Sequence, residues 1–294
     1  MKPNPSPALP VISLLLGATS WGILWYPFRI MERAGLSAPV ATLLSYAVAL
    51  LVGSLFFFRA WREFKAQTKW LAGIALAAGI TNISYLVSIM QAEVIRIVLL
   101  FYLAPLWTIP LARLILHERM TGASYAVMVL AMTGAGVMLW RPELGFPAPR
   151  NGHEWLGLCA GVAFALSNVL TKGAKDTSAE AKSLAVSFGV MLLALPVALL
   201  LDPAVATWPT RASPHVLLLA VIGIVLATTS VTLQYGLSRL AANRAAVILL
   251  FELVVAAIAS HYLAGEVTRL QDWIGGAMII TAGMLVTLTD KTTI

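Results

Sequence analysis

One carboxylate stands well inside an otherwise apolar stretch, and it is the residue of this chain most suited to chemistry. Glu252 lies in residues 245–265, a stretch without Asp, Lys or Arg. It falls seven residues from the start of this stretch, which is roughly 10–12 Å deep in a helix. An isolated carboxylate is costly at such a depth in a membrane, so it should face a wet cavity, be protonated or bond a partner. We expect Glu252 to meet the amino group of a solute or to carry a coupling proton. A structural hydrogen bond to a neighbouring helix is the alternative.

Aromatic and amide side chains in other apolar stretches form a second group of candidates. Trp21 and Trp25 stand one helical turn apart and would share a helix face. An aromatic-lined cavity with few polar groups suits an aromatic or apolar zwitterion, whereas helix packing is the alternative for each residue taken alone. The predicted substrate-binding residues are Trp21, Trp25, Asn82, Tyr85, Tyr102, Asn168, Gln234, Tyr235 and Glu252.

Catalytic and cofactor motifs are absent from the sequence. It holds no HExxH, no GxSxG, no phosphate-binding glycine loop and a single cysteine, Cys159. The four histidines fall near the ends of apolar stretches without the spacing of metal ligands. We therefore predict no enzyme activity, no cofactor and no metal site, so any transport must run on a solute or ion gradient.

The composition indicates that lipid surrounds the elements that hold these residues. Of 294 residues, 60% are hydrophobic and 11% are charged, against about 25% charged in soluble domains. Soluble enzymes, disulfide scaffolds and disordered chains are excluded. Charges separate ten apolar stretches, each able to form a transmembrane helix of about 20 residues. These stretches are 3–28, 34–58, 70–92, 97–112, 120–140, 155–171, 183–201, 212–238, 245–265 and 273–289.

The distribution of lysine and arginine predicts the orientation of the chain. Thirteen lie on the side of the N-terminus and seven on the opposite side, so both termini are expected in the cytoplasm. The basic segment 59–69 fits an anionic lipid surface better than nucleic acid. We therefore predict a multi-pass protein of the bacterial inner membrane with membrane lipid and a small molecule as partners and no nucleic acid. Burial in the bilayer lets a monomer suffice.

The chain resembles itself at an offset of 148 residues. Arg96 then matches Arg244 and Glu118 matches Glu266, and Gly-containing helices follow in both copies. Both acids are expected to stabilise helix N-termini or to bond a neighbouring turn. Because each half has five spans, the second half would cross the membrane in the opposite sense. Such inverted repeats are typical of secondary transporters, and chance similarity between apolar helices is the alternative. We predict an all-α membrane protein with one five-helix repeat in 1–140 and an inverted one in 154–294.

Several motifs give the chain a family resemblance. The run from Leu100-Phe-Tyr-Leu-Ala-Pro105 to Glu118, the later Gly134-Ala-Gly136 and the start Gly17-Ala-Thr-Ser-Trp21-Gly22 resemble the EamA-type signature of the drug/metabolite transporter superfamily. Within that superfamily, the chain is similar in length and around Tyr102 to YddG-type exporters of aromatic amino acids. In this family Pro often follows the acid of the ninth helix, whereas here Leu253 does. The departure puts a kink at that point in doubt, while Pro105 and Pro110 leave the fourth helix breakable.

These observations together predict a transporter that exports small organic solutes by alternating access. The resemblance implies aromatic or neutral amino acids as the substrates. Multidrug or cationic-compound efflux is the alternative within the same class, and a membrane assembly protein without transport is the alternative of another class. Glu93 and Arg96 are three residues apart and are expected to pair.

Overall fold

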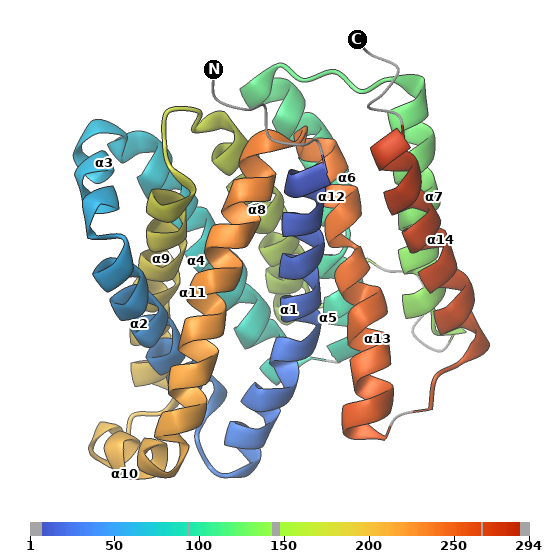
Figure 1. Ribbon diagram of the computed structural model, residues 1–294. Coiled ribbons are helices and arrows are strands. Elements are labelled where there is room, and N and C mark those ends of the chain that lie inside the picture. The colour runs from blue at the N-terminus through green and yellow to red at the C-terminus, as the bar shows by residue number, and fades with distance from the viewer. Residues whose placement is uncertain (1–7, 93, 143–147, 266, 289–294) are drawn as a thin grey trace.

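A computed structural model describes residues 8–92, 94–142, 148–265 and 267–288 of the chain (Figure 1). Within these ranges the regular structure is helical throughout. The first half of the chain forms α1 Ala8–Arg33, α2 Ala38–Phe56, α3 Trp61–Ala66, α4 Thr68–Gln91, α5 Val94–Phe101, α6 Ala104–Leu111 and α7 Gly122–Leu139. The second half forms α8 Gly152–Gly173, α9 Ala179–Leu201, α10 Trp208–Ala212, α11 Val216–Arg239, α12 Ala242–Leu249, α13 Phe251–Ala264 and α14 Leu270–Leu288.

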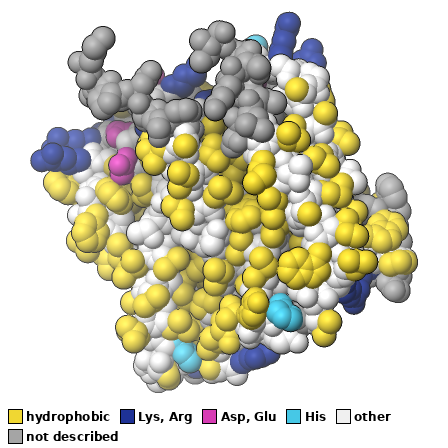
Figure 2. All heavy atoms as spheres, turned by 45° about the vertical axis from the view of Figure 1, so that its right-hand side comes forward, with side chains coloured by type: hydrophobic (Ala, Val, Ile, Leu, Met, Phe, Trp, Pro, Cys, Tyr) yellow, Lys and Arg dark blue, Asp and Glu magenta, His cyan; other side chains and the backbone are white. Residues whose placement is uncertain are grey.

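Most of the predicted spans are present as helices that are long and apolar enough to cross a membrane. Nine such segments occur in the described residues, and they correspond to the first nine predicted spans. The last predicted span coincides with α14, a helix of 19 residues, so the count of ten crossings stays a prediction. Figure 2 shows an apolar surface across the middle of the molecule, with most of the Lys and Arg side chains of this face toward its two ends. This distribution fits a protein whose middle lies in hydrocarbon.

Two of the spans are broken near their midpoints. The fourth is divided into α5 and α6, with Pro105 in the first turn of α6, as the prolines predicted. The ninth is divided into α12 and α13 at Leu250, although no proline follows Glu252. Leu250 keeps right-handed helical torsions at this break, with φ −61° and ψ −16°. At both breaks the backbone makes short-range bonds, from Leu103 N to Leu100 O and from Leu250 N to Val247 O, which tighten the turn and end the α-helix.

Helix boundaries repeat along the chain with the offset that the sequence indicated. The bounds of α4 and α11 differ by 148 residues at both ends, and so do those of α5 and α12. The first residues of α7 and α14 differ by the same number. Both breaks thus fall at matching places in the two copies. This agreement is difficult to attribute to chance similarity between apolar helices.

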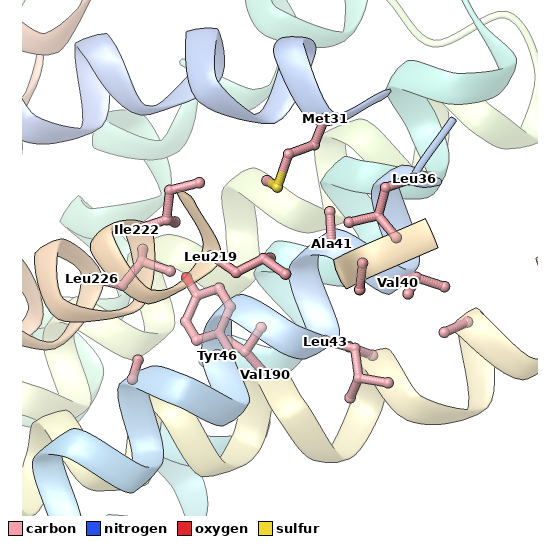
Figure 3. Packing of buried hydrophobic residues seen from close by; sticks show 14 of the residues in the cluster. Met31, Leu36, Val40, Ala41, Leu43, Tyr46, Val190, Leu219, Ile222 and Leu226 are labelled. Carbon is pink, nitrogen blue, oxygen red and sulfur yellow. The ribbon is translucent and has the colours of Figure 1, made fainter. Parts of the chain in front are cut away.

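The packing places one helix pair at the side of the molecule. In Figure 1, α1 begins and α14 ends at the same end of the molecule, and the α7–α14 pair stands at the right. These two helices meet where a Cβ atom on Gly134 would lie 2.7 Å from the carbonyl oxygen of Gly275. Elsewhere α1, α2, α9 and α11 enclose a cluster that includes Met31, Tyr46 and Ile222 (Figure 3). Because lipid is as apolar as these side chains, close packing rather than water exclusion holds such helices together.

An ionic network joins two loops at the end of the molecule opposite to the start of α1. The Asp202 carboxylate accepts hydrogen bonds from the Arg211 guanidinium at 2.8 Å and from the Ser37 hydroxyl at 2.6 Å. It follows α9, outside the membrane-spanning segments. These donors, Arg211 first, lower the pKa of Asp202 from 3.8 to about 2. The network connects the turn before α2 with the segment that leads to α11.

We expect the Asp202 network to make stability depend on acidity. Because the pKa of Asp202 is lowered in the folded protein, its contribution of about 2 kcal/mol is complete above pH 4 and is lost as the pH falls toward 2. Asp202→Asn should lower the free energy of unfolding by about this amount at pH 7. Unfolding in detergent between pH 6 and pH 2 measures both effects. A slope over the acid range that is the same in wild type and Asp202→Asn would contradict this assignment.

Candidate functional site

The two helix breaks bring a carboxylate and a phenol together in the interior. Glu252 lies in the first turn of α13, near the middle of the span Ala242–Ala264. Tyr102 lies in the turn between α5 and α6, and it lines the same cavity as Glu252. Because the N-terminal end of a helix carries partial positive charge, the start of α13 stabilises a carboxylate at this position. Both residues are predicted site residues, and the choice between a solute contact and a structural hydrogen bond for Glu252 stays a prediction.

A small cavity lies between these residues. Its volume is about 20 Å³, enough for about one water molecule. The N-terminal end of α6 contributes Ala104 and Pro105, and α8 contributes Phe164 and the buried Asn168. The starts of both half-helices α6 and α13 thus border the same space. Their partial positive charges together favour an anionic group in it, while the Glu252 side chain favours a cationic one.

Aromatic rings surround the polar groups of the cavity. The ring of Phe101 lies 5.4 Å from Tyr102, 5.0 Å from Tyr85 and 5.4 Å from Phe164, measured between ring centres. Of the nine predicted site residues, Tyr102, Asn168 and Glu252 line the cavity, and Tyr85 packs against Phe101 beside it. Sequence reasoning did not include Phe101 and Phe164, although Phe164 stands four residues before Asn168, on the same helix face.

The other five predicted residues do not line this cavity. Asn82 accepts a hydrogen bond from Tyr46 at 3.1 Å, and Gln234 accepts one from Thr171 at 2.8 Å. The Tyr235 ring lies 3.6 Å from the guanidinium carbon of Arg239. The first two contacts join neighbouring helices, and the third lies at the end of α11. Each of these three side chains therefore has a structural role that needs no ligand.

The two tryptophans of α1 lie beside the helix that carries Glu252. Between them stands Gly22, where an added Cβ atom would lie 3.0 Å from the carbonyl oxygen of Glu252. Trp21 packs against the cluster of Figure 3. The Trp25 ring meets Tyr26 edge to face at 5.6 Å. Close contact of α1 with α13 therefore fixes the backbone of Glu252, and the role of both tryptophans in binding stays a prediction.

A buried ion pair fixes the outer half of the broken fourth span, α5, to α8. The Arg96 guanidinium donates to both carboxylate oxygens of Glu154, at 2.9 and 2.8 Å, and to the carbonyl oxygen of Ala148 at 2.9 Å. Both side chains of the pair are almost fully buried. The sequence predicted a pair with Glu93, which lies outside the described residues. The Glu154 partner was missed because an acid in the first turn of a helix is common for reasons of the helix dipole alone.

Glu118, which precedes α7, contacts the N-terminus of a helix, as the sequence predicted. Glu118 accepts a hydrogen bond at 3.0 Å from the backbone N–H of Ala242, the first residue of α12. It thus stabilises the N-terminus of a neighbouring helix. Its repeat counterpart, Glu266, lies outside the described residues. Among the residues that the structure describes, no three His, Cys, Asp or Glu side chains come together as a metal site would require.

Comparisons with known proteins agree on the class. A model of the EamA-like transporter family matches residues 8–140 and again 153–288. The chain is 28% identical to an uncharacterized transporter of Archaeoglobus fulgidus over 76% of this chain and 78% of the other. It is also 28% identical to a probable terminal-alkyne amino-acid exporter of Streptantibioticus cattleyicolor, over 94% of this chain and 92% of the other. A solved structure with 18% identity superposes with a TM-score of 0.75 over 96% of this chain and 98% of that one.

Proposed function

The chain belongs to the EamA-like transporter family, and we propose that it exports small organic solutes, namely aromatic or neutral amino acids, by alternating access. It is a multi-pass membrane protein and a transporter by family, not an enzyme. The observation that carries the proposal is the placement of Glu252 at the start of half-helix α13, in a cavity with aromatic walls. Half-helices that end near the membrane centre are where secondary transporters bind their substrates.

The two charges of an amino acid have complementary partners in this cavity. The ammonium group would bind the Glu252 carboxylate, with Asn168 as a neighbouring hydrogen-bonding group. The substrate carboxylate would lie at the N-terminal ends of α6 and α13, whose partial positive charges favour it. Phe101, Tyr102 and Phe164 would contact an apolar or aromatic side chain. A zwitterion uses every feature of the site.

The cavity must widen to admit an amino acid. A volume of about 20 Å³ holds a water molecule, whereas sites for small molecules usually exceed about 300 Å³. The broken spans supply the parts that would move, because α5 and α6, like α12 and α13, are joined by turns without a continuous helical backbone. We take the repeats 1–140 and 154–294 as the two units that rock against each other.

Further features support the direction and the surroundings of transport. The relative from Streptantibioticus cattleyicolor is described as an amino-acid exporter, which favours export of a related solute here. The excess of Lys and Arg on one side favours cytoplasmic termini and the bacterial inner membrane. Membrane lipid would then be the main partner of a monomer.

A lipophilic cation is the second candidate substrate. Glu252 with aromatic neighbours also suits such a cation, and the residues that line the cavity include no Lys or Arg. The start of two half-helices at the cavity favours the zwitterion, because a cation would gain nothing from their partial positive charges. A membrane assembly protein would carry neither solute.

Flux into liposomes that contain the purified protein tests the proposal. We expect saturable flux of labelled phenylalanine and tryptophan, weaker flux of threonine and alanine, and competition by unlabelled phenylalanine. A pH gradient that accelerates flux would identify proton coupling. Flux of an aromatic cation with no flux of the four amino acids would contradict the proposal and favour drug efflux. No flux of either would favour the assembly protein.

A further inference from the structure

An apolar groove lies beside the Glu252 cavity and opens between α5 and α7. Its volume is about 570 Å³, within the range of small-molecule sites. Leu99 and Leu103 of the broken fourth span form one wall, and Met132, Gly136 and Val137 of α7 form the other. All five belong to segments apolar enough to span a membrane. In a bilayer the groove therefore opens toward hydrocarbon at the depth of the site.

The groove and the cavity have one lining residue in common, Tyr102. Tyr102 lines both spaces, and Glu252 lines the cavity. To join the cavity of about 20 Å³ to the apolar groove of about 570 Å³, Tyr102 would have to move. The joined space has the charge pattern of an amphiphile, with Glu252 at one end and aliphatic side chains at the other.

The two halves of the chain differ at the floor of the groove. A Cβ atom added to Gly136 would meet no heavy atom within 4 Å, so open space lies above this residue. At the repeat offset of 148 residues, Gly136 corresponds to Met284 and Tyr102 to the buried Leu250. The open space at Gly136 in the first half thus corresponds to a larger side chain in the second.

We propose that this groove is the subsite for the apolar side chain of the exported solute, reached when Tyr102 turns aside. The inference rests on the proposed function, because Glu252 must hold the amino group of the same molecule. Continuity through Tyr102 argues for the solute as the occupant, since a bilayer lipid would fill the groove without use of the adjoining carboxylate. The substrate class becomes amino acids with extended apolar side chains, including chains too long for an enclosed cavity.

Competition by a homologous series tests the subsite. Unlabelled straight-chain 2-amino acids, from alanine to 2-aminodecanoate, compete with flux of labelled phenylalanine into liposomes. In the wild type each added methylene should strengthen competition, by up to about fourfold where it is fully buried. Gly136→Phe fills the groove from a position where its Cβ atom meets nothing. Gly283→Phe on α14 is the matched control, because Gly283 also has open space around it.

We expect Gly136→Phe to weaken competition by 2-aminooctanoate at least about tenfold and competition by alanine less than twofold, with Gly283→Phe like wild type. If competition depends on chain length in the same way in wild type and Gly136→Phe, the subsite is overturned. Saturable phenylalanine flux in that experiment would still support the proposed function. A wild-type series without dependence on chain length would also overturn it and leave bilayer lipid as the occupant. If the wild type carries no amino acid at all, the proposed function fails and this inference fails with it.

Discussion

Glu252→Gln should lower phenylalanine flux at low substrate concentration by about 10- to 100-fold. The carboxylate makes a charge-assisted hydrogen bond to the substrate ammonium, worth about 1.5–3 kcal/mol, and the amide makes a neutral one. The amide keeps the size of the side chain and its capacity for hydrogen bonds, so the fold at the break between α12 and α13 should persist. Initial rates in liposomes with equal amounts of reconstituted protein measure the effect.

Two further variants test whether the effect is specific to the carboxylate of Glu252. Glu32→Gln removes an exposed carboxylate near the end of α1 and should leave flux within twofold of wild type. Tyr102→Phe keeps the ring and removes a hydroxyl group from a residue that lines the cavity, so a smaller loss of about fivefold is expected. Equal flux by wild type and Glu252→Gln over the whole pH range would refute a role for the carboxylate in transport.

Breaking the buried ion pair between α5 and α8 should cause the largest loss of stability. Glu154→Leu removes the carboxylate that accepts two hydrogen bonds from the buried Arg96 guanidinium, which costs about 3–5 kcal/mol of the free energy of unfolding. The double variant Arg96→Leu with Glu154→Leu removes both charges and should recover most of this loss, because a pair replaced by apolar groups is close to neutral. Unfolding in detergent, followed by tryptophan fluorescence, measures wild type, Arg96→Leu, Glu154→Leu and the double variant, which together complete a double-mutant cycle.

The control for the ion pair is a charge that the structure leaves exposed. Lys175→Leu changes a side chain in the turn between α8 and α9 and should alter stability by less than about 0.5 kcal/mol. If Glu154→Leu is no less stable than Lys175→Leu, the pair does not hold α5 on α8. Additive effects of the two substitutions at Arg96 and Glu154 would lead to the same conclusion.

The spans were predictable because charge is so sparse in this chain. Each apolar stretch is bounded by Lys, Arg, Asp or Glu, and nine of them match helices of spanning length. Pro105 indicated the break before α6, since proline removes a helical hydrogen bond. The break at Leu250 carried no such signal. It depends on a local change from α-helical to tighter backbone bonds, which apolar residues accommodate without any change of type.

The residues of the candidate site could be predicted where a polar or charged side chain is costly inside a membrane. They could not be predicted where the side chain is apolar. Glu252 stood out because an acid is expensive at its depth, and Tyr102 because it is a polar aromatic residue inside an apolar stretch. Phe101 and Phe164 belong to the most common residue types of a membrane interior, so position alone distinguishes them. The pairing of Arg96 with Glu154 joins residues 58 positions apart, and only the approach of α5 to α8 brings them together. Asn82 and Gln234 were costly as well, but neighbouring helices satisfy them.

Equilibrium binding to the purified protein tests most directly whether the Glu252 cavity is the solute site. Titration calorimetry in detergent with phenylalanine, phenethylamine and 3-phenylpropionate separates the two charges of the substrate. The account predicts binding of one phenylalanine per chain, weaker binding of phenethylamine, which keeps the amine, and none of 3-phenylpropionate, which lacks it. Glu252→Gln should bind phenylalanine at least about tenfold more weakly than wild type. Equal affinity of wild type and Glu252→Gln for phenylalanine would contradict the account.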